Sequence, residues 1–213
     1  MADAQPFNTF SSSSSPMRRA PRGNRLAAAT GRLTIAYWTQ RFRLSTSPVH
    51  TKLKVFGATT WGITRTQLKE KLNYLDEHRT IGSLPEVLKQ CDYIVNVLPS
   101  TPNTLGLLNG NMLENCKDRG AVFINVGRSS IIKEVDLINA IQQQWISGAI
   151  LDVFEKEPLP KDSKLWTLPH VTLSPHISGV TRPQDVANFF AKNYQKFVKG
   201  EDLLNKVNLH EGY

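Results

Sequence analysis

The sequence predicts an α/β fold built on a doubly wound parallel sheet. Three observations support this class: short apolar segments recur between residues 92 and 177, helical patterns lie between several of them, and 213 residues suit one domain or slightly more. Strands separated by helices over such distances form parallel pairs with right-handed crossovers. The strand segments are apolar throughout, which indicates that both faces of the sheet are covered.

The individual elements follow from local patterns. Strands are β-branched or apolar runs that stop at proline or polar residues, and they are expected at 92–98, 121–126, 147–154 and 171–177, with a further short apolar run at 58–63. Helices have apolar residues at helical spacing, and they are expected at 84–90, 110–117, 133–144 and 181–198. Ser83 is the expected N-cap of the first of these helices. Residues 92–198 should therefore form the parallel sheet and its helices.

Residues 1–50 differ in composition from the rest of the chain. They contain five consecutive serines, seven arginines, no lysine and a single acid, Asp3. The net charge of +8 thus belongs mainly to this segment. Such a segment buries little apolar surface and is expected to be irregular, with a short basic amphipathic stretch at 24–44. Two interpretations stay open, an organelle transit peptide and an unstructured extension from another start or exon.

Several classes of protein are excluded. No run approaches the roughly 18 apolar residues of a membrane helix. Two cysteines, Cys91 and Cys116, rule out a disulfide framework and a four-cysteine zinc site, and no metal is expected. The basic segment lacks the stacking aromatic repeat of a nucleic-acid module, so neither nucleic acid nor membrane is an expected partner.

Polar residues gather where the predicted strands end. Ligands of such sheets bind beyond the carboxyl ends of the strands. Arg128 follows the strand at 121–126, Asp152 and Glu157 lie at the end of the next one, and His176 lies at the end of the last. One edge of the sheet is therefore the expected functional edge.

Four strings along this edge resemble the D-2-hydroxyacid dehydrogenase family. They are VLPSTPNT, FINVGRSSIIKEVDLINAI, GAILDVFEKEPLP and LSPHISG, and the resemblance runs from about Val55 to Tyr213. The similarity is greatest to the glyoxylate/hydroxypyruvate reductase-like branch. It implies an NAD(P)-binding domain of Rossmann type, a smaller substrate domain, and usually a homodimer.

The resemblance implies a catalytic set of Arg128, Glu157 and His176. A planar guanidinium can hold the carboxylate of a 2-keto acid with two hydrogen bonds. A histidinium near the carbonyl can donate the proton while hydride arrives from the nicotinamide. A carboxylate on the far ring nitrogen favours the charged ring, which is the role implied for Glu157.

Cofactor contacts are implied at other strand ends. The residues concerned are Thr64, Arg65, Leu98, Pro99, Thr104, Val126, Gly127, Asp152 and Gly179. Of these, Asp152 is expected to contact the nicotinamide amide. NAD-specific sites place an acid after the second strand, but here Arg65 lies between Thr64 and Thr66, and no acid occurs before Glu70. Arg65 suits a 2′-phosphate, so NADP is the preferred cofactor and NAD the alternative.

One expected feature is missing. No G-x-G-x-x-G occurs in the sequence, although it should lie just before Val55. The first strand of the fold and the N-terminal third that forms most of the substrate domain are therefore expected to be absent. This predicts an incomplete Rossmann-type domain in a shortened form of the enzyme.

The chain is thus expected to have three parts: an irregular extension at 1–51, a partial NAD(P)-binding domain at 52–180, and a C-terminal helix and tail at 181–213. The predicted function is NAD(P)-dependent reduction of a small 2-keto acid such as glyoxylate or hydroxypyruvate, with activity of the shortened chain in doubt. The alternative is an inactive relative that binds dinucleotide or protein as a regulator. The expected location is the cytoplasm, or the mitochondrion if residues 1–50 are a transit peptide.

Overall fold

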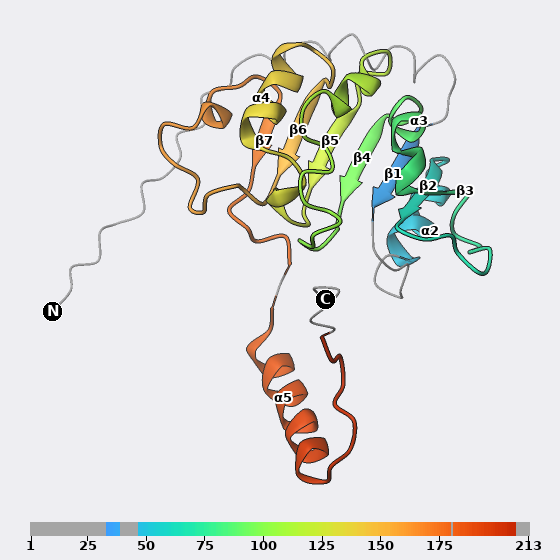
Figure 1. Ribbon diagram of the computed structural model, residues 1–213, viewed down its shortest axis with the longest axis vertical. Coiled ribbons are helices and arrows are strands. Elements are labelled where there is room, and N and C mark those ends of the chain that lie inside the picture. The colour runs from blue at the N-terminus through green and yellow to red at the C-terminus, as the bar shows by residue number, and fades with distance from the viewer. Residues whose placement is uncertain (1–32, 39–46, 180, 208–213) are drawn as a thin grey trace, which may run out of the picture.

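A computed structural model describes residues 33–38, 47–179 and 181–207. Its central feature is a seven-stranded sheet in the order β3-β2-β1-β4-β5-β6-β7, and every neighbouring pair is parallel (Figure 1). The strands are β1 (Thr34–Trp38), β2 (Thr59–Thr64), β3 (Glu77–Thr80), β4 (Tyr93–Asn96), β5 (Val122–Asn125), β6 (Gly148–Leu151) and β7 (Val171–Leu173). The doubly wound parallel sheet is confirmed.

The first strand of the sheet is present, which corrects the expectation that it is missing. Strand β1 lies in the centre of the sheet, with Ala36 paired to Trp61 of β2 and to Ile94 of β4. The segment expected to be irregular up to residue 50 therefore contains a strand and the start of helix α2 (Ser47–Val55). Thr34–Trp38 is also extended rather than part of an amphipathic stretch at 24–44. Residues 1–32 and 39–46, with the possible transit peptide, lie outside the described residues.

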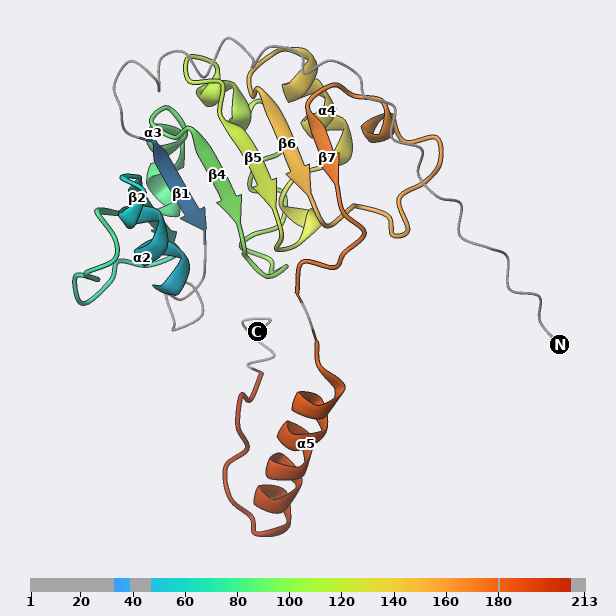
Figure 2. The same ribbon diagram turned by 180° about the vertical axis from the view of Figure 1, so that it is seen from behind.

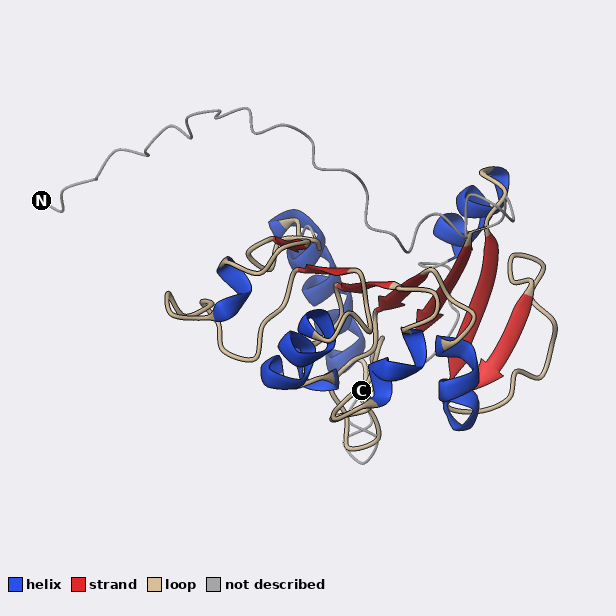
Figure 3. Ribbon diagram, turned by 90° about the horizontal axis from the view of Figure 1, so that it is seen from above, coloured by secondary structure: helices blue, strands red, loops and turns tan. Residues whose placement is uncertain are grey.

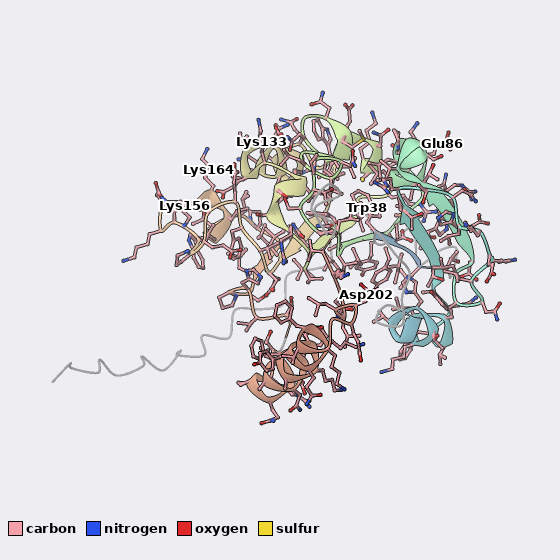
Figure 4. All side chains as sticks on the ribbon, turned by 60° about the horizontal axis from the view of Figure 1, so that its bottom comes forward. Trp38, Glu86, Lys133, Lys156, Lys164 and Asp202 are labelled. Atoms are coloured by element: carbon pink, nitrogen blue, oxygen red, sulfur yellow. The ribbon has the colours of Figure 1, made fainter. Side chains whose placement is uncertain are left out.

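Successive side chains of β1 point to opposite faces of the sheet, which explains how this strand fits in the sheet centre. Ala36 and Trp38 are 0% and 1% exposed and belong to the main core, while Ile35 and Tyr37 belong to a smaller cluster on the opposite face with Leu53 of α2. A central strand needs apolar residues on both sides, because both of its faces are covered. Figure 4 shows Trp38 inside the body and Lys133, Lys156 and Lys164 at its rim.

Helices lie on both faces of the sheet. The main core is covered by α3 (Leu84–Leu88), by α4 (Glu134–Gln142) and by the 3₁₀ turns that connect the strands, whereas α2 lies on the other face beside β1 and β2 (Figures 2 and 3). The 3₁₀ turns are η1 (Ile81–Ser83), η2 (Met112–Cys116), η3 (Ser129–Ile131) and η4 (Lys164–Trp166). Glu134 and Asp136 in the first turn of α4 stabilise the positive end of its dipole.

Two further elements and one cap differ from the sequence-based expectation. The helix expected at 110–117 is the 3₁₀ turn η2, where Asn115 Nδ2 donates to the carbonyl of Met112 and competes with α-helical pairing. Strand β3 was not predicted, because its sequence EHRT is polar and only partly buried. Ser83 precedes α3 as expected but makes no side-chain capping bond.

The last helix, α5 (Pro183–Val198), lies beyond the carboxyl edge of the sheet, as Figure 1 shows. None of its residues is buried, and its aromatic side chains include Phe190 stacked on Tyr194 at 6.3 Å. Among the described residues, no helix combines the length and the apolar character needed to cross a bilayer.

Candidate functional site

The predicted site residues all lie at the carboxyl edge of the sheet. Thr64 ends β2, Leu98 follows β4, Gly127 and Arg128 follow β5, Asp152 follows β6, and His176 follows β7. Parallel strands bring these ends to one edge. The sheet order separates Thr64 from His176 by five strand steps, so the site extends along the edge.

A histidine and a glutamate meet at the end of β7. His176 Nδ1 lies 2.8 Å from Glu157 Oε2, and the two side chains are 50% and 37% exposed. Ring nitrogen Nε2 of His176 forms no hydrogen bond with the described part of the chain. The arrangement can present a proton on Nε2 to a bound molecule while the carboxylate holds the other side of the ring.

Glu157 is held from behind. Its Oε1 accepts a hydrogen bond from the backbone N–H of Phe154 at 3.0 Å. The hydrogen bond from His176, followed by the one from Phe154, lowers the pKa of Glu157 below its usual value. The carboxylate is therefore ionised at neutral pH and can balance a charged imidazolium.

Asp152 anchors the loop that carries His176. It is 2% exposed, and its Oδ1 accepts from Ser174 Oγ at 2.5 Å and from Ile177 N at 3.0 Å, while Oδ2 accepts from Ser178 N at 3.0 Å. Burial alone would raise the pKa of Asp152, but the hydrogen bonds from Ser174 and Ser178 outweigh it and the pKa lies well below the usual range. The predicted contact of Asp152 with the nicotinamide stays a prediction.

The loop places His176 in an uncommon backbone conformation. Its φ is 54°, in the left-handed region that costs a non-glycine residue about 1–2 kcal/mol. The bonds of Asp152 fall on both sides of His176, at Ser174 before it and at Ile177 and Ser178 after it. These bonds hold the ring toward Glu157 despite the strained backbone.

Arg128 lies at the end of β5, which is separated by β6 from the strand that leads to His176. Its side chain is exposed, and NH1 donates to the carbonyl of Gly127 at 2.8 Å. Gly127 packs so closely on the segment after β4 that an added Cβ would lie 2.8 Å from Leu98 O and 2.9 Å from Leu98 N. A residue without a side chain is therefore required at this turn.

Other predicted cofactor residues shape the edge between β4 and β5. Leu98 and Thr104 are buried, and Thr104 Oγ1 donates to the carbonyl of Pro99 at 2.7 Å, which closes the loop after β4. Val126 N donates to Asn96 O at 3.2 Å. Gly179 lies in open space, since an added Cβ would meet no atom within 4 Å.

The end of β2 combines a buried threonine with an exposed arginine. Thr64 is 3% exposed, and its Oγ1 contacts the Thr66 carbonyl at 2.6 Å and His78 Nε2 at 2.7 Å. Arg65 follows it and is exposed at the edge. A guanidinium with no acid nearby in sequence suits a 2′-phosphate.

An apolar cavity of about 580 Å³ adjoins the histidine–glutamate pair. The residues that line it are Phe154, Glu157, Pro158, Leu159, Trp166, Leu173, Ser174, Pro175 and His176. It therefore offers an apolar wall next to the ring.

Sequence reasoning missed three polar residues of this edge. Asn96 and Asn125 are buried at the ends of β4 and β5, and Ser174 donates a hydrogen bond to Asp152. The signal for the two asparagines is that each lies within an otherwise apolar strand. Burying an amide there costs free energy unless the amide forms hydrogen bonds.

A family model and several solved structures match this chain. Residues 46–178 match the family described as D-isomer specific 2-hydroxyacid dehydrogenase, NAD binding domain. A solved 2-hydroxyacid dehydrogenase from Xanthobacter autotrophicus, in complex with NADPH and MES, is 31% identical, with 88% of this chain and 80% of that chain covered and a TM-score of 0.76.

Two further solved structures are similar. An NADPH-dependent glyoxylate/hydroxypyruvate reductase from Sinorhizobium meliloti, in complex with NADP and sulfate, is 26% identical, covers 85% of this chain and 57% of its own, and has a TM-score of 0.76. A probable 2-hydroxyacid dehydrogenase from Rhizobium etli, in complex with NADP, is 28% identical over 93% of this chain and 60% of its own, with a TM-score of 0.75. This chain thus spans about 60% of the length of these two proteins. From the matched domain, the sheet and the relative at 31% identity, the chain belongs to the D-isomer specific 2-hydroxyacid dehydrogenase family.

Proposed function

We propose that this chain binds NADP(H) along the carboxyl edge of its sheet and reduces a small 2-keto acid such as glyoxylate or hydroxypyruvate. The contact between His176 Nδ1 and Glu157 Oε2 at 2.8 Å carries the proposal. It fixes an imidazole with one nitrogen held by a carboxylate and the other open at the functional edge, which is what a proton donor to a carbonyl needs.

Each member of the set has a separate task. The reduced nicotinamide supplies the hydride when it is bound. His176 donates a proton from Nε2 to the carbonyl oxygen as negative charge develops there, and Glu157 stabilises the charged ring before transfer. Arg128 holds the substrate carboxylate through its planar guanidinium, which orients the carbonyl toward His176.

The proposed preference for NADP rests on the end of β2. Arg65 places a positive charge beyond the strand, and the similar reductase from Sinorhizobium meliloti was solved with NADP. The proposed contacts with the rest of the cofactor are made by Leu98, Pro99, Thr104, Val126, Gly127, Asp152 and Gly179. The sequence has no glycine between residues 32 and 56, so it lacks the glycine fingerprint that this fold carries after its first strand.

The chain spans 60% and 57% of two similar proteins, so the activity of a whole enzyme is part of the proposal. The proposal also includes a homodimer and a cytoplasmic location. We also propose that the C-terminal helix and tail, from residue 181, form a part distinct from the cofactor domain. A regulator that binds dinucleotide without turnover is the second candidate, and the missing G-x-G-x-x-G favours it.

Two measurements on the purified chain separate these candidates. NADPH and NADH are titrated by protein fluorescence, and NADPH oxidation is then followed with glyoxylate and with hydroxypyruvate. We expect tighter binding of NADPH and turnover that falls about 10²–10⁴-fold in His176→Ala. Binding without turnover would establish the regulator, and turnover equal in the His176→Ala variant would contradict the proposed acid.

A further inference from the structure

A buried pair of amide side chains joins the carboxyl ends of β4 and β5. Asn96 and Asn125 are Cα partners in the register of the two strands, and they are 0% and 2% exposed. Asn96 Nδ2 donates to Asn125 Oδ1 at 2.8 Å. Burial of two amides is costly unless their donors and acceptors find partners, so the remaining bonds of the pair define what it stabilises.

Both amides donate to the same backbone carbonyl. Asn125 Nδ2 lies 3.2 Å from Arg128 O, and Asn96 Nδ2 lies 3.3 Å from it. On the acceptor side, Asn125 Oδ1 takes the N–H of Gly127 at 3.2 Å, and Asn96 Oδ1 takes the N–H of Leu98 at 3.1 Å. A flipped amide would place an NH₂ group against these N–H donors, so the backbone fixes the orientation of both side chains.

We infer that Asn96 and Asn125 are positioning residues for Arg128. They hold its carbonyl directly, and Asn125 also holds Gly127, whose carbonyl accepts the guanidinium NH1 of Arg128 at 2.8 Å. The backbone of Arg128 and the residue that accepts its guanidinium are therefore both held by the pair. The inference rests on the proposed function, in which this guanidinium binds the substrate carboxylate.

The physical reason is the geometry of the guanidinium. Two parallel hydrogen bonds to a carboxylate form only in a narrow range of orientations. A long side chain that leaves its place by about 1 Å can cost a reaction on the order of 10²-fold. A buried pair within two adjacent strands is a rigid support for such a side chain, because strands of the sheet core move little.

The variant Asn125→Asp tests the inference with little change in volume. It keeps an oxygen for Gly127 N and for Asn96 Nδ2, but it replaces the donor to Arg128 O with a second oxygen that repels the carbonyl. Asn125→Ser removes the same donor without a charge and serves if the acid fails to fold. Asn115→Asp is the matched control, because Asn115 also donates its amide to a backbone carbonyl, at Met112 O, away from the edge.

Oxalate carries carboxylates that the Arg128 guanidinium can bind, so its affinity depends on how well Arg128 is positioned. The affinity is measured by calorimetry in the presence of NADPH. We expect Asn125→Asp to weaken oxalate about 10- to 100-fold when Arg128 is present, and less than about threefold in an Arg128→Ala background. Asn115→Asp should leave the affinity unchanged. Equal losses in both backgrounds would overturn the inference, since the pair would then act without Arg128.

A second readout needs no ligand and separates this inference from the proposed function. Nitrogen relaxation of the Arg128 Nε–H group should show greater side-chain mobility in Asn125→Asp and Asn125→Ser than in the parent chain or Asn115→Asp. An unmodified chain that binds no oxalate would contradict the proposed function, while this relaxation measurement would still decide the positioning role. Unchanged Arg128 mobility in both Asn125 variants would overturn it.

Discussion

The ring of His176 contacts the carboxylate of Glu157 at 2.8 Å, although both side chains are partly open to solvent. An ion pair at the surface usually adds less than about 1 kcal/mol to the free energy of unfolding, so stability alone does not explain this contact. This pair is instead held by the main chain of Phe154 on one side and by the Asp152-anchored loop on the other. The geometry is thus fixed while the ring stays accessible.

Glu157→Gln should move the pH optimum of 2-keto acid reduction toward acid. The pKa of Glu157 is lowered, chiefly by the bond from His176, so the carboxylate is charged throughout the neutral range and favours a protonated ring. The amide carries no negative charge, so proton donation by His176 loses the carboxylate that balances the imidazolium. The pH profile of turnover measures the shift.

Glu155→Gln is the control for this prediction. Glu155 is two positions from Glu157, and its carboxylate accepts a hydrogen bond from the backbone N–H of Glu134 and not from His176. Its pH profile should match that of the parent chain. An unchanged profile in Glu157→Gln would show that the glutamate does not set the charge of the ring.

Asp152→Asn should destabilise the fold by about 2–4 kcal/mol at pH 7, since one amide nitrogen would face N–H donors now bound by a carboxylate. The folded pKa of Asp152 is depressed, so its contribution is complete above the unfolded value of about 4 and is lost as pH falls further. Urea unfolding at several pH values measures this. The loss of stability below about pH 4 should be smaller in the variant, and Asp162→Asn, at an exposed position, should behave like the parent.

Arg65→Asp should raise the Michaelis constant for NADPH about 10- to 100-fold and change that for NADH much less. The charge reversal turns an attraction for the 2′-phosphate into a repulsion, and only NADPH carries that group. Steady-state kinetics with both cofactors measure the ratio, with Lys71→Asp as an exposed control nearby. Equal changes for the two cofactors would remove Arg65 from the site.

Gly127→Ala should cost about 1–3 kcal/mol of stability, because the new methyl group would meet the backbone of Leu98, which cannot rotate away. Gly179→Ala meets no atom within 4 Å and should change stability by less than about 0.5 kcal/mol. Thermal unfolding of the two variants makes the comparison. A stable Gly127→Ala would show that β4 and β5 separate easily at this end.

Ala36→Pro should destabilise the sheet by about 3 kcal/mol or more. Ala36 is in the central strand with partners on both sides, and proline removes a ladder donor there. Circular dichroism during urea unfolding tests it. A midpoint equal to that of the parent chain would contradict the placement of β1 in the sheet.

The sequence predicted strands β4 to β7 and helices α3, α4 and α5, because each is an apolar or amphipathic run between clear stops. Strand β1 was missed for a physical reason: TIAYW is flanked by arginines and serines whose composition indicates an irregular segment. A strand in the centre of a sheet depends on partners far along the chain, here β2 and β4, and composition does not report them.

The candidate site was predicted as a set of residues but not as a set of contacts. Arg128, Glu157 and His176 were found through their positions after strands and through the family strings. The bonds of Asp152 to the His176 loop and of Asn96 to Arg128 could not be predicted, since each joins the ends of two different strands. The bond of Asn125 to Arg128 is local, but it depends on the orientation of a buried amide that composition does not report. Their roles in binding and catalysis stay predictions.

The place of β1 also bears on how the protein folds. Strands β2 and β3 reach the rest of the sheet through β1, and Thr34 N donates to Asp92 Oδ2, 58 residues along the chain. Closing so long a loop is slow compared with forming the local units on either side of it. Strands β1 to β3 and strands β4 to β7 should therefore protect their amides from hydrogen exchange as two cooperative units, with Arg65 beside the first and His176 beside the second.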